Sequence, residues 1–227
     1  MTLLITIGPS IALLLYFILS DKFKEPKKII IITFLFGVLI TIPAGYLNYF
    51  IDKHFENESV INNALLHGFF SGGLVEETLK FLVLYFYVLK EKAFNEPMDA
   101  IVYGVVISLG FATLENIEYV YFSKYAGLDT AIIRAYSAVP MHCLCAVVMG
   151  YYFGSYVFSG EGKYMGLALI IPVVFHGTYN FLCAFPNNYF LFVVFILLIF
   201  SILLHRNAKV RQRGKRTESE EKKVWLI

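Results

Sequence analysis

The sequence predicts an all-α protein: a polytopic transmembrane helical bundle of about seven spans. The 227 residues are 58% hydrophobic and 16% charged, and the mean hydropathy is +0.67. Soluble domains are about 45–50% apolar and about 25% charged. Seven apolar runs approach or exceed the length of a bilayer-spanning helix, about 20 residues. These observations argue against a water-soluble enzyme, and they exclude a disordered or collagen-like chain.

The predicted spans follow one another with short polar connections. The first, Leu3 to Leu19, has no basic segment before it and no small-residue cleavage site after it, so we expect a retained span rather than a signal peptide. The others cover residues 29–51, 63–89, 98–122, 131–158, 164–184 and 189–204. Residues 1–205 are therefore predicted to form one transmembrane domain, and residues 206–227 a polar, basic cytoplasmic tail.

The distribution of positive charge predicts the orientation of the spans. With the N-terminus outside, fifteen of the nineteen Lys and Arg residues fall in inside connections and in the tail, and only Lys53 and Lys124 fall in outside connections. Cytoplasmic loops of membrane proteins carry an excess of Lys and Arg. We therefore expect the N-terminus outside and the C-terminus inside.

Ionisable side chains lie inside four consecutive predicted spans, where each is costly unless it is paired or hydrated. Glu76 and Lys80 are four residues apart and are expected to share a helix face, as are His176 and Asn180. Counting along the spans places five polar residues between the midplane and the outer leaflet: Glu76, Glu115, His142, His176 and Asn180. One polar site, open toward the extracytoplasmic side, is therefore predicted.

The residue types at this site suit hydrolysis of a peptide bond. A buried carboxylate beside a like-charged neighbour can act as a general base toward water. Adjacent Glu76 and Glu77 provide such a pair, and Lys80 could hold one of them ionised. His and Asn side chains can donate hydrogen bonds to an oxyanion. The favoured prediction is water activated by Glu, with no cofactor required.

Zinc is the alternative reading of the same residues. Glu and His side chains bind zinc, and the metal would then activate the water. The sequence has no H-E-x-x-H pattern, the commonest of the zinc proteases, and no G-x-S-x-G of a serine hydrolase. The candidate zinc ligands are Glu77, Glu115, His142 and His176.

Four motifs resemble those of the PrsW family of membrane-embedded proteases. Residues 76–80 resemble its E-E-x-x-K motif, and residues 111–115 its F-x-x-x-E motif. Residues 140–142 and 176–180 resemble its two histidine motifs. The family is similar to the CAAX-type prenyl proteases, whose second motif has His where this chain has Glu115.

The resemblance implies an intramembrane endopeptidase of the bacterial cell membrane. It implies site-1 cleavage of a single-span anti-sigma factor on its extracytoplasmic side, after which a site-2 protease acts on the same substrate and the sigma factor is activated in a stress response. The expected partners are this substrate and the lipid bilayer. No nucleic-acid partner is expected, because the basic tail is explained by anionic lipid.

The resemblance also implies roles for individual residues. Glu76, Glu77 and His176 would be indispensable. By analogy with CAAX proteases, Glu76 would activate water with His142 nearby, while His176 and Asn180 would stabilise the oxyanion. Glu115 completes the catalytic candidates, and Lys80 and Phe111 are supporting residues.

Other functions remain open at this point. The same Glu and His residues could form the relay of a proton- or ion-coupled transporter, although the chain lacks the paired repeats typical of transporters. Glu76 and Glu77 could instead form a structural salt bridge with Lys80. Glu118 and Arg134 are expected to be interfacial or paired with each other.

Overall fold

The computed structural model describes the backbone of residues 1–55 and 58–224, with side chains through Gln212. All regular structure in this part is helical. Its elements are α1 (Thr2–Ser20), α2 (Lys27–His54), α3 (Val60–Leu66), the π-helix η1 (His67–Glu76), α4 (Glu77–Phe86), the 3₁₀-helix η2 (Val88–Lys90), α5 (Pro97–Tyr121), α6 (Leu128–Tyr136), α7 (Ala138–Ser159), α8 (Lys163–Cys183) and α9 (Tyr189–Val224).

Six helical stretches of the described chain are long and apolar enough to cross a membrane. They are α1, α2, α5, residues 128–159, α8 and residues 189–212. The span predicted at residues 63–89 is instead built from α3, η1 and α4 in direct succession. The all-helical class is confirmed. Because none of these three segments is long enough by itself to cross a membrane, the seven-span count stays a prediction, and so does the orientation.

Two predicted regions differ from the structure in detail. The span expected at residues 131–158 is broken into α6 and α7 at Ser137, whose φ and ψ are −123° and −71°. Pro140 has no N–H to continue the α-helical ladder at this point, and the Ser137 hydroxyl donates to the Ile133 carbonyl at 2.7 Å. At the other end of the chain, α9 continues to Val224, so helix occupies most of the expected tail. The tail side chains beyond Gln212 lie outside the described part.

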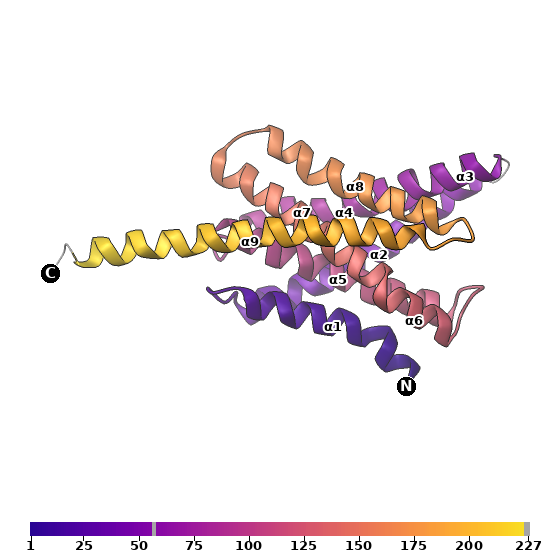
Figure 1. Ribbon diagram of the computed structural model, residues 1–227, viewed down its shortest axis with the longest axis horizontal. Helices are drawn as coiled ribbons and strands as arrows, with labels where there is room; N and C mark the ends of the chain where they lie inside the picture. The colour runs from indigo at the N-terminus through magenta and orange to yellow at the C-terminus, as the bar shows by residue number, and fades with distance from the viewer. Residues whose placement is uncertain (56–57, 225–227) are drawn as a thin grey trace.

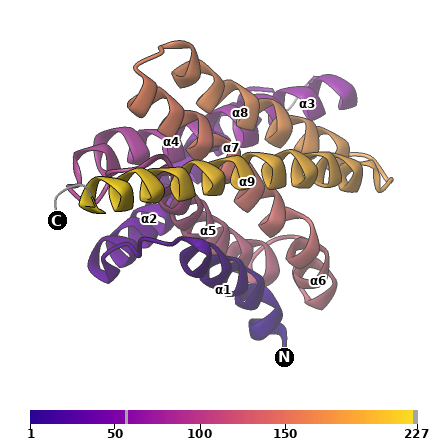
Figure 2. The same cartoon turned by 60° about the vertical axis from the view of Figure 1, so that its left-hand side comes forward.

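The core of the bundle is built around α5, which α1, α2 and α7 surround (Figures 1 and 2). Most of its residues are buried, including Ile101, Val105 and Leu109. By contrast, α1, α2 and α9 expose many large apolar side chains on their outer faces, such as Leu4, Leu35 and Phe192. An apolar outer surface around a buried central helix is what a multi-pass membrane protein requires.

Glycines bring the backbones of these helices into direct contact. A Cβ on Gly37 of α2 would lie 2.1 Å from the Ile107 carbonyl oxygen of α5, and one on Gly150 of α7 would lie 2.4 Å from the Ala100 carbonyl oxygen. Small residues allow such close approach between helices in membranes. The positions of α2 and α7 against α5 therefore depend on the lack of a side chain at Gly37 and Gly150.

Gly37→Ala is expected to lower the free energy of unfolding by about 1–3 kcal/mol, because the new methyl group would push α2 away from α5. The matched control is Gly45→Ala in the same helix, where nothing lies within 4 Å of the added Cβ. Alanine at position 45 is expected to leave the free energy of unfolding unchanged or to raise it slightly. Thermal unfolding in detergent micelles measures both. Equal unfolding midpoints for the two variants would contradict the close-packing argument.

The two ends of the bundle differ. The α1–α2 connection, the α7–α8 connection and the end of α9 lie at one end, and α3, α6 and the α8–α9 connection lie at the other (Figure 1). Lysines concentrate at the first end, in residues 22–28, 90–92 and 163. This end is called the lysine-rich end below.

Candidate active site

The widened helix η1 ends at the first acidic residue of the site. Glu76 is its last residue, and Glu77 is the first residue of α4. π-helical turns are rare and occur frequently at functional sites. Within η1, a Cβ on Gly72 would lie 1.9 Å from the Asn180 amide nitrogen and 3.7 Å from His176 Nε2. The glycine therefore lets α8 bring His176 and Asn180 against η1.

Glu77 is a fully buried hub of the site. Its Oε1 accepts a hydrogen bond from Lys80 Nζ at 2.7 Å and one from His176 Nδ1 at 2.8 Å. Lys80 Nζ also lies 3.0 Å from His142 Nδ1 and 4.4 Å from the centre of the Phe111 ring. Glu77 thus holds one histidine directly and is linked to the other through Lys80.

These contacts assign the tautomers of both histidines. An ammonium group only donates, so His142 Nδ1 accepts from Lys80, and its Nε2–H donates to Glu115 Oε2 at 2.9 Å. A carboxylate only accepts, so His176 Nδ1–H donates to Glu77. In the neutral ring, His176 Nε2 then carries a lone pair, and it lies 3.9 Å from Glu76 Oε2.

Glu76 is less completely bonded than Glu77. Its Oε2 is buried without a hydrogen-bond partner and lies 3.8 Å from Lys80 Nζ. The Asn48 amide lies between Glu76 Oε1, at 3.4 Å, and the backbone carbonyl of Ser71. The rotamer of that amide decides which of the two oxygens receives its N–H. Glu76 Oε2 is therefore an acceptor available to a further group.

Arg134 completes the site, although the sequence predicted a different partner for its side chain. Its Nη2 lies 2.6 Å from Glu115 Oε2, and its Nε donates to Asn116 Oδ1 at 2.5 Å. Arg134 was expected to be interfacial or paired with Glu118, and it pairs with Glu115 instead. The signal for the true partner was the cost of an unpaired arginine at membrane depth. Pro140 was the sequence signal for the break at Ser137, which sets the position of α6 beside α5.

The charges of the described site do not balance. Three carboxylates, those of Glu76, Glu77 and Glu115, face two permanent cations, Lys80 and Arg134. With both imidazoles neutral, one negative charge is left over in a buried place. Such a charge is unfavourable unless it takes up a proton or a cation.

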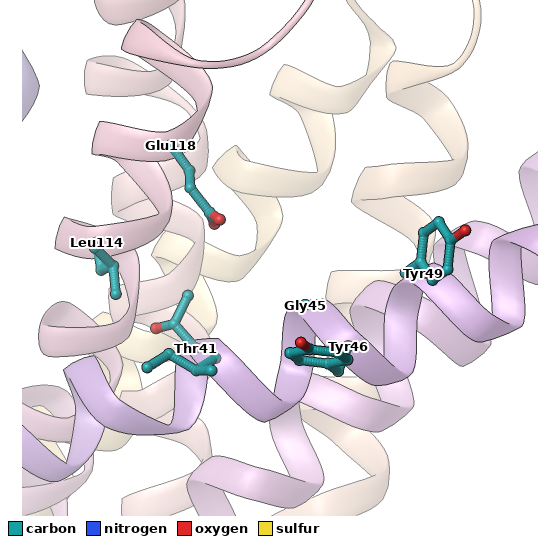
Figure 3. A pocket seen from close by; sticks show the side chains of 7 residues that line it. Thr41, Gly45, Tyr46, Tyr49, Leu114 and Glu118 are labelled. Atoms are coloured by element: carbon teal, nitrogen blue, oxygen red, sulfur yellow. The ribbon is translucent and has the colours of Figure 1, made fainter.

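A cavity of about 760 Å³ connects this cluster to the end of the bundle opposite the lysine-rich end. Its lining extends from Glu76, His142 and His176 to Asp52 and Ala184, near the α2–α3 and α8–α9 connections. A groove between α2 and α5 shares Thr41, Gly45, Tyr49 and Glu118 with this lining (Figure 3). The cavity thus reaches both the end of the bundle and its side.

The structure brings all the predicted site residues together. Six of them line the cavity: Glu76, Phe111, Glu115, His142, His176 and Asn180. Glu77 and Lys80 lie behind the lining, where they hold the histidines. Glu77 is therefore placed to position His176 rather than to meet a substrate.

Residues 25–205 match the family model described as "PrsW family intramembrane metalloprotease". The chain belongs to the PrsW family. Relatives from several bacteria carry the name "Protease PrsW". The protein of Geobacillus kaustophilus (strain HTA426) is 38% identical over 78% of this chain and 76% of its own length. That of Bacillus subtilis (strain 168) is 35% identical over 90% and 93%, and that of Clostridioides difficile (strain 630) is 32% identical over 87% and 86%.

Membership of the PrsW family makes the chain a membrane-embedded, multi-pass protease, a hydrolase, and it favours this activity over the transporter alternative. No solved structure matches the chain. The description of the PrsW family also implies a metal.

The described residues offer one set of donors that fits zinc. Donor atoms of Glu76, His142 and His176 lie within 4.8 Å of one another, and two histidines with one glutamate are a common zinc set. Glu76 Oε2 has no hydrogen-bond partner. His176 Nε2 has a lone pair while Nδ1–H is held by a carboxylate, as in many metal-binding histidines. His142 would have to exchange one of its hydrogen bonds. The predicted ligands Glu77 and Glu115 instead contact the two histidines.

Proposed function

We propose that the chain makes the first cut in a single-span anti-sigma factor, on its extracytoplasmic side, and so starts the release of a sigma factor. The observation that carries the proposal is the cavity, which joins the Glu and His cluster to the end of the bundle away from the lysine-rich end. Lysine-rich connections favour the cytoplasm, so that end would face outward. A site-2 protease would then act on the remaining fragment.

Glu76 is the residue that we assign to the attacking water. Its unpartnered Oε2 would accept a proton as the water oxygen adds to the peptide carbonyl, and would return that proton to the leaving amine. His142, fixed between Lys80 and Glu115, would stay in place beside it. The product would be two peptides, formed without a covalent intermediate.

The developing oxyanion would be stabilised from α8. The Asn180 amide can donate without any change of protonation. His176 Nε2 can donate only when its ring is protonated, and the Glu77 carboxylate at Nδ1 would stabilise that positive charge. Glu77 therefore acts through His176 as a positioning residue.

The zinc arrangement uses the same cavity. Glu76, His142 and His176 would hold the ion, which when bound supplies a Lewis acid for the peptide carbonyl and the water. Glu77 would then fix the orientation of the His176 ring through Nδ1, and Glu115 would stay paired with Arg134 beside His142.

The test is cleavage of a single-span anti-sigma factor reconstituted with the purified protein in liposomes. One cut is expected, within the extracytoplasmic juxtamembrane segment, located by mass spectrometry of both fragments. A parallel sample is treated with a strong zinc chelator and then given zinc. Loss and recovery of cleavage supports the zinc arrangement, and unchanged cleavage supports Glu76 as the base. No cleavage of several such substrates by folded protein would contradict the proposal.

A further inference from the structure

A second group of buried carboxylates lies at the lysine-rich end, remote in the fold from the protease site. Asp21 follows the last turn of α1, Glu25 belongs to the α1–α2 connection, and Asp99 lies in the first turn of α5. Asp21 and Asp99 are 3% and 1% exposed. One carboxylate oxygen from each of the three residues can be chosen so that all lie within 4.8 Å of one another. These three residues are called the acidic cluster.

In each buried aspartate of the acidic cluster, one carboxylate oxygen accepts hydrogen bonds and the other accepts none. Asp21 Oδ1 accepts from Gln212 Nε2 at 2.7 Å and from Phe23 N at 3.1 Å. Asp99 Oδ2 accepts from the backbone N–H groups of Asn95 and Glu96 at 2.8 and 2.9 Å. Asp21 Oδ2 and Asp99 Oδ1 are buried and have no hydrogen-bond partner. Two fixed carboxylates thus each have an oxygen that accepts from no donor, and Asp99 lies close enough to Glu25 to share a proton with it.

The described cations do not pair with these acids. Within the part of the chain whose side chains are described, no Lys, Arg or His nitrogen forms a salt bridge with Asp21, Glu25 or Asp99. Lys24 Nζ instead donates to the carbonyls of Ile18, Leu19 and Asp21 at the end of α1. Burial, with the Asp21 and Glu96 carboxylates nearby, raises the pKa of the Glu25 carboxyl. Among the described side chains, the acidic cluster therefore carries excess negative charge unless it takes up a cation or a proton.

We propose that Asp21, Glu25 and Asp99 bind one hard divalent cation, Ca²⁺ or Mg²⁺. Ca²⁺–oxygen distances are about 2.3–2.6 Å, so oxygens on opposite sides of the ion lie up to about 5 Å apart. The donor oxygens lie within 4.8 Å of one another, so small side-chain movements would bring all three to Ca²⁺. Mg²⁺, with oxygens at about 2.0–2.1 Å, would draw the carboxylates slightly closer and keep several waters.

A cation here would connect three helices that are distant in the sequence. Asp21 belongs to the end of α1, Asp99 to the start of α5, and Gln212 of α9 donates to both Asp21 and Glu96. Tyr103 of α5 donates to Glu25. The bound ion would therefore fix α9 against the α1–α2 connection, a role separate from the chemistry of the protease site.

The experiment measures the unfolding midpoint of metal-stripped full-length protein in detergent, titrated with CaCl₂ or MgCl₂. Glu76→Gln is the background, so that the candidate zinc set of the protease site loses its only carboxylate. At saturating cation a rise of about 5–10 °C is expected. It should be lost in Asp21→Asn and in Glu25→Gln but kept in Glu161→Gln, a control at an exposed glutamate of the same end. The more effective ion identifies the occupant.

Equilibrium dialysis with ⁴⁵Ca²⁺ gives a second readout on folded protein, with about one ion per chain expected, unless Mg²⁺ alone shifts the midpoint. The proposal would be overturned by an unfolding midpoint that does not change with either cation. It would also be overturned if the midpoint rose equally in Asp21→Asn and Glu25→Gln. If the midpoint instead rises as the pH falls and ignores cations, protons occupy the acidic cluster, because a raised pKa in the folded state stabilises it at low pH.

Discussion

Glu76→Gln is expected to lower the rate of substrate cleavage by at least about 10²–10⁴-fold while the bundle stays folded. The amide nearly preserves the shape of the side chain but removes its basicity, and general-base catalysis contributes about this factor. The loss is expected with or without a metal, since the amide is also a poor zinc ligand. Fragment formation over time in the liposome assay measures it.

The control for Glu76→Gln is Glu58→Gln, which makes the same chemical change at an exposed residue near the start of α3. It should cleave at the wild-type rate. Unfolding midpoints of both variants show whether lost activity reflects chemistry or misfolding. A Glu76→Gln protein with wild-type activity would remove Glu76 from the reaction, whichever role it was given.

Lys80→Met is expected to have the largest effect on stability. Lys80 is 2% exposed and lies 2.7 Å from Glu77, which is fully buried. Removing one partner of a buried ion pair costs about 3–5 kcal/mol, because the other charge stays buried without compensation. Denaturant titration in mixed micelles measures the loss.

Two further variants test the cause of this loss. Lys163→Met removes the exposed partner of Glu161 and should leave the unfolding curve unchanged, as surface pairs contribute little. The double variant Lys80→Met with Glu77→Gln removes both buried charges and should recover part of the stability. If the double variant is no more stable than Lys80→Met alone, the unpaired carboxylate is not the cause.

Hydropathy and motif spacing predicted much of this protein. The ends of α2, α5 and α8 lie within about three residues of their predicted positions. The predicted site residues meet because a polar group at membrane depth is costly unless it pairs with another polar group. The i, i+4 rule brought His176 and Asn180 to one face, and both line the cavity.

Other features depend on contacts between helices and were invisible to a local pattern. The local rule gives Lys80 its contact with Glu76, at 3.8 Å, whereas its contact with His142 of α7, at 3.0 Å, depends on how the helices pack. The pairing of Arg134 with Glu115 required the position of α6.

The charged residues of the segment at residues 60–86 have a consequence for biogenesis. This segment carries Glu76, Glu77 and Lys80, and charged residues at the centre of a helix oppose insertion by about 2.5–3.5 kcal/mol each. Its counter-groups on α5, α7 and α8 are synthesised after it. The segment therefore settles in the bilayer only once those later helices arrive, so that membrane integration and assembly of the protease site are a single event.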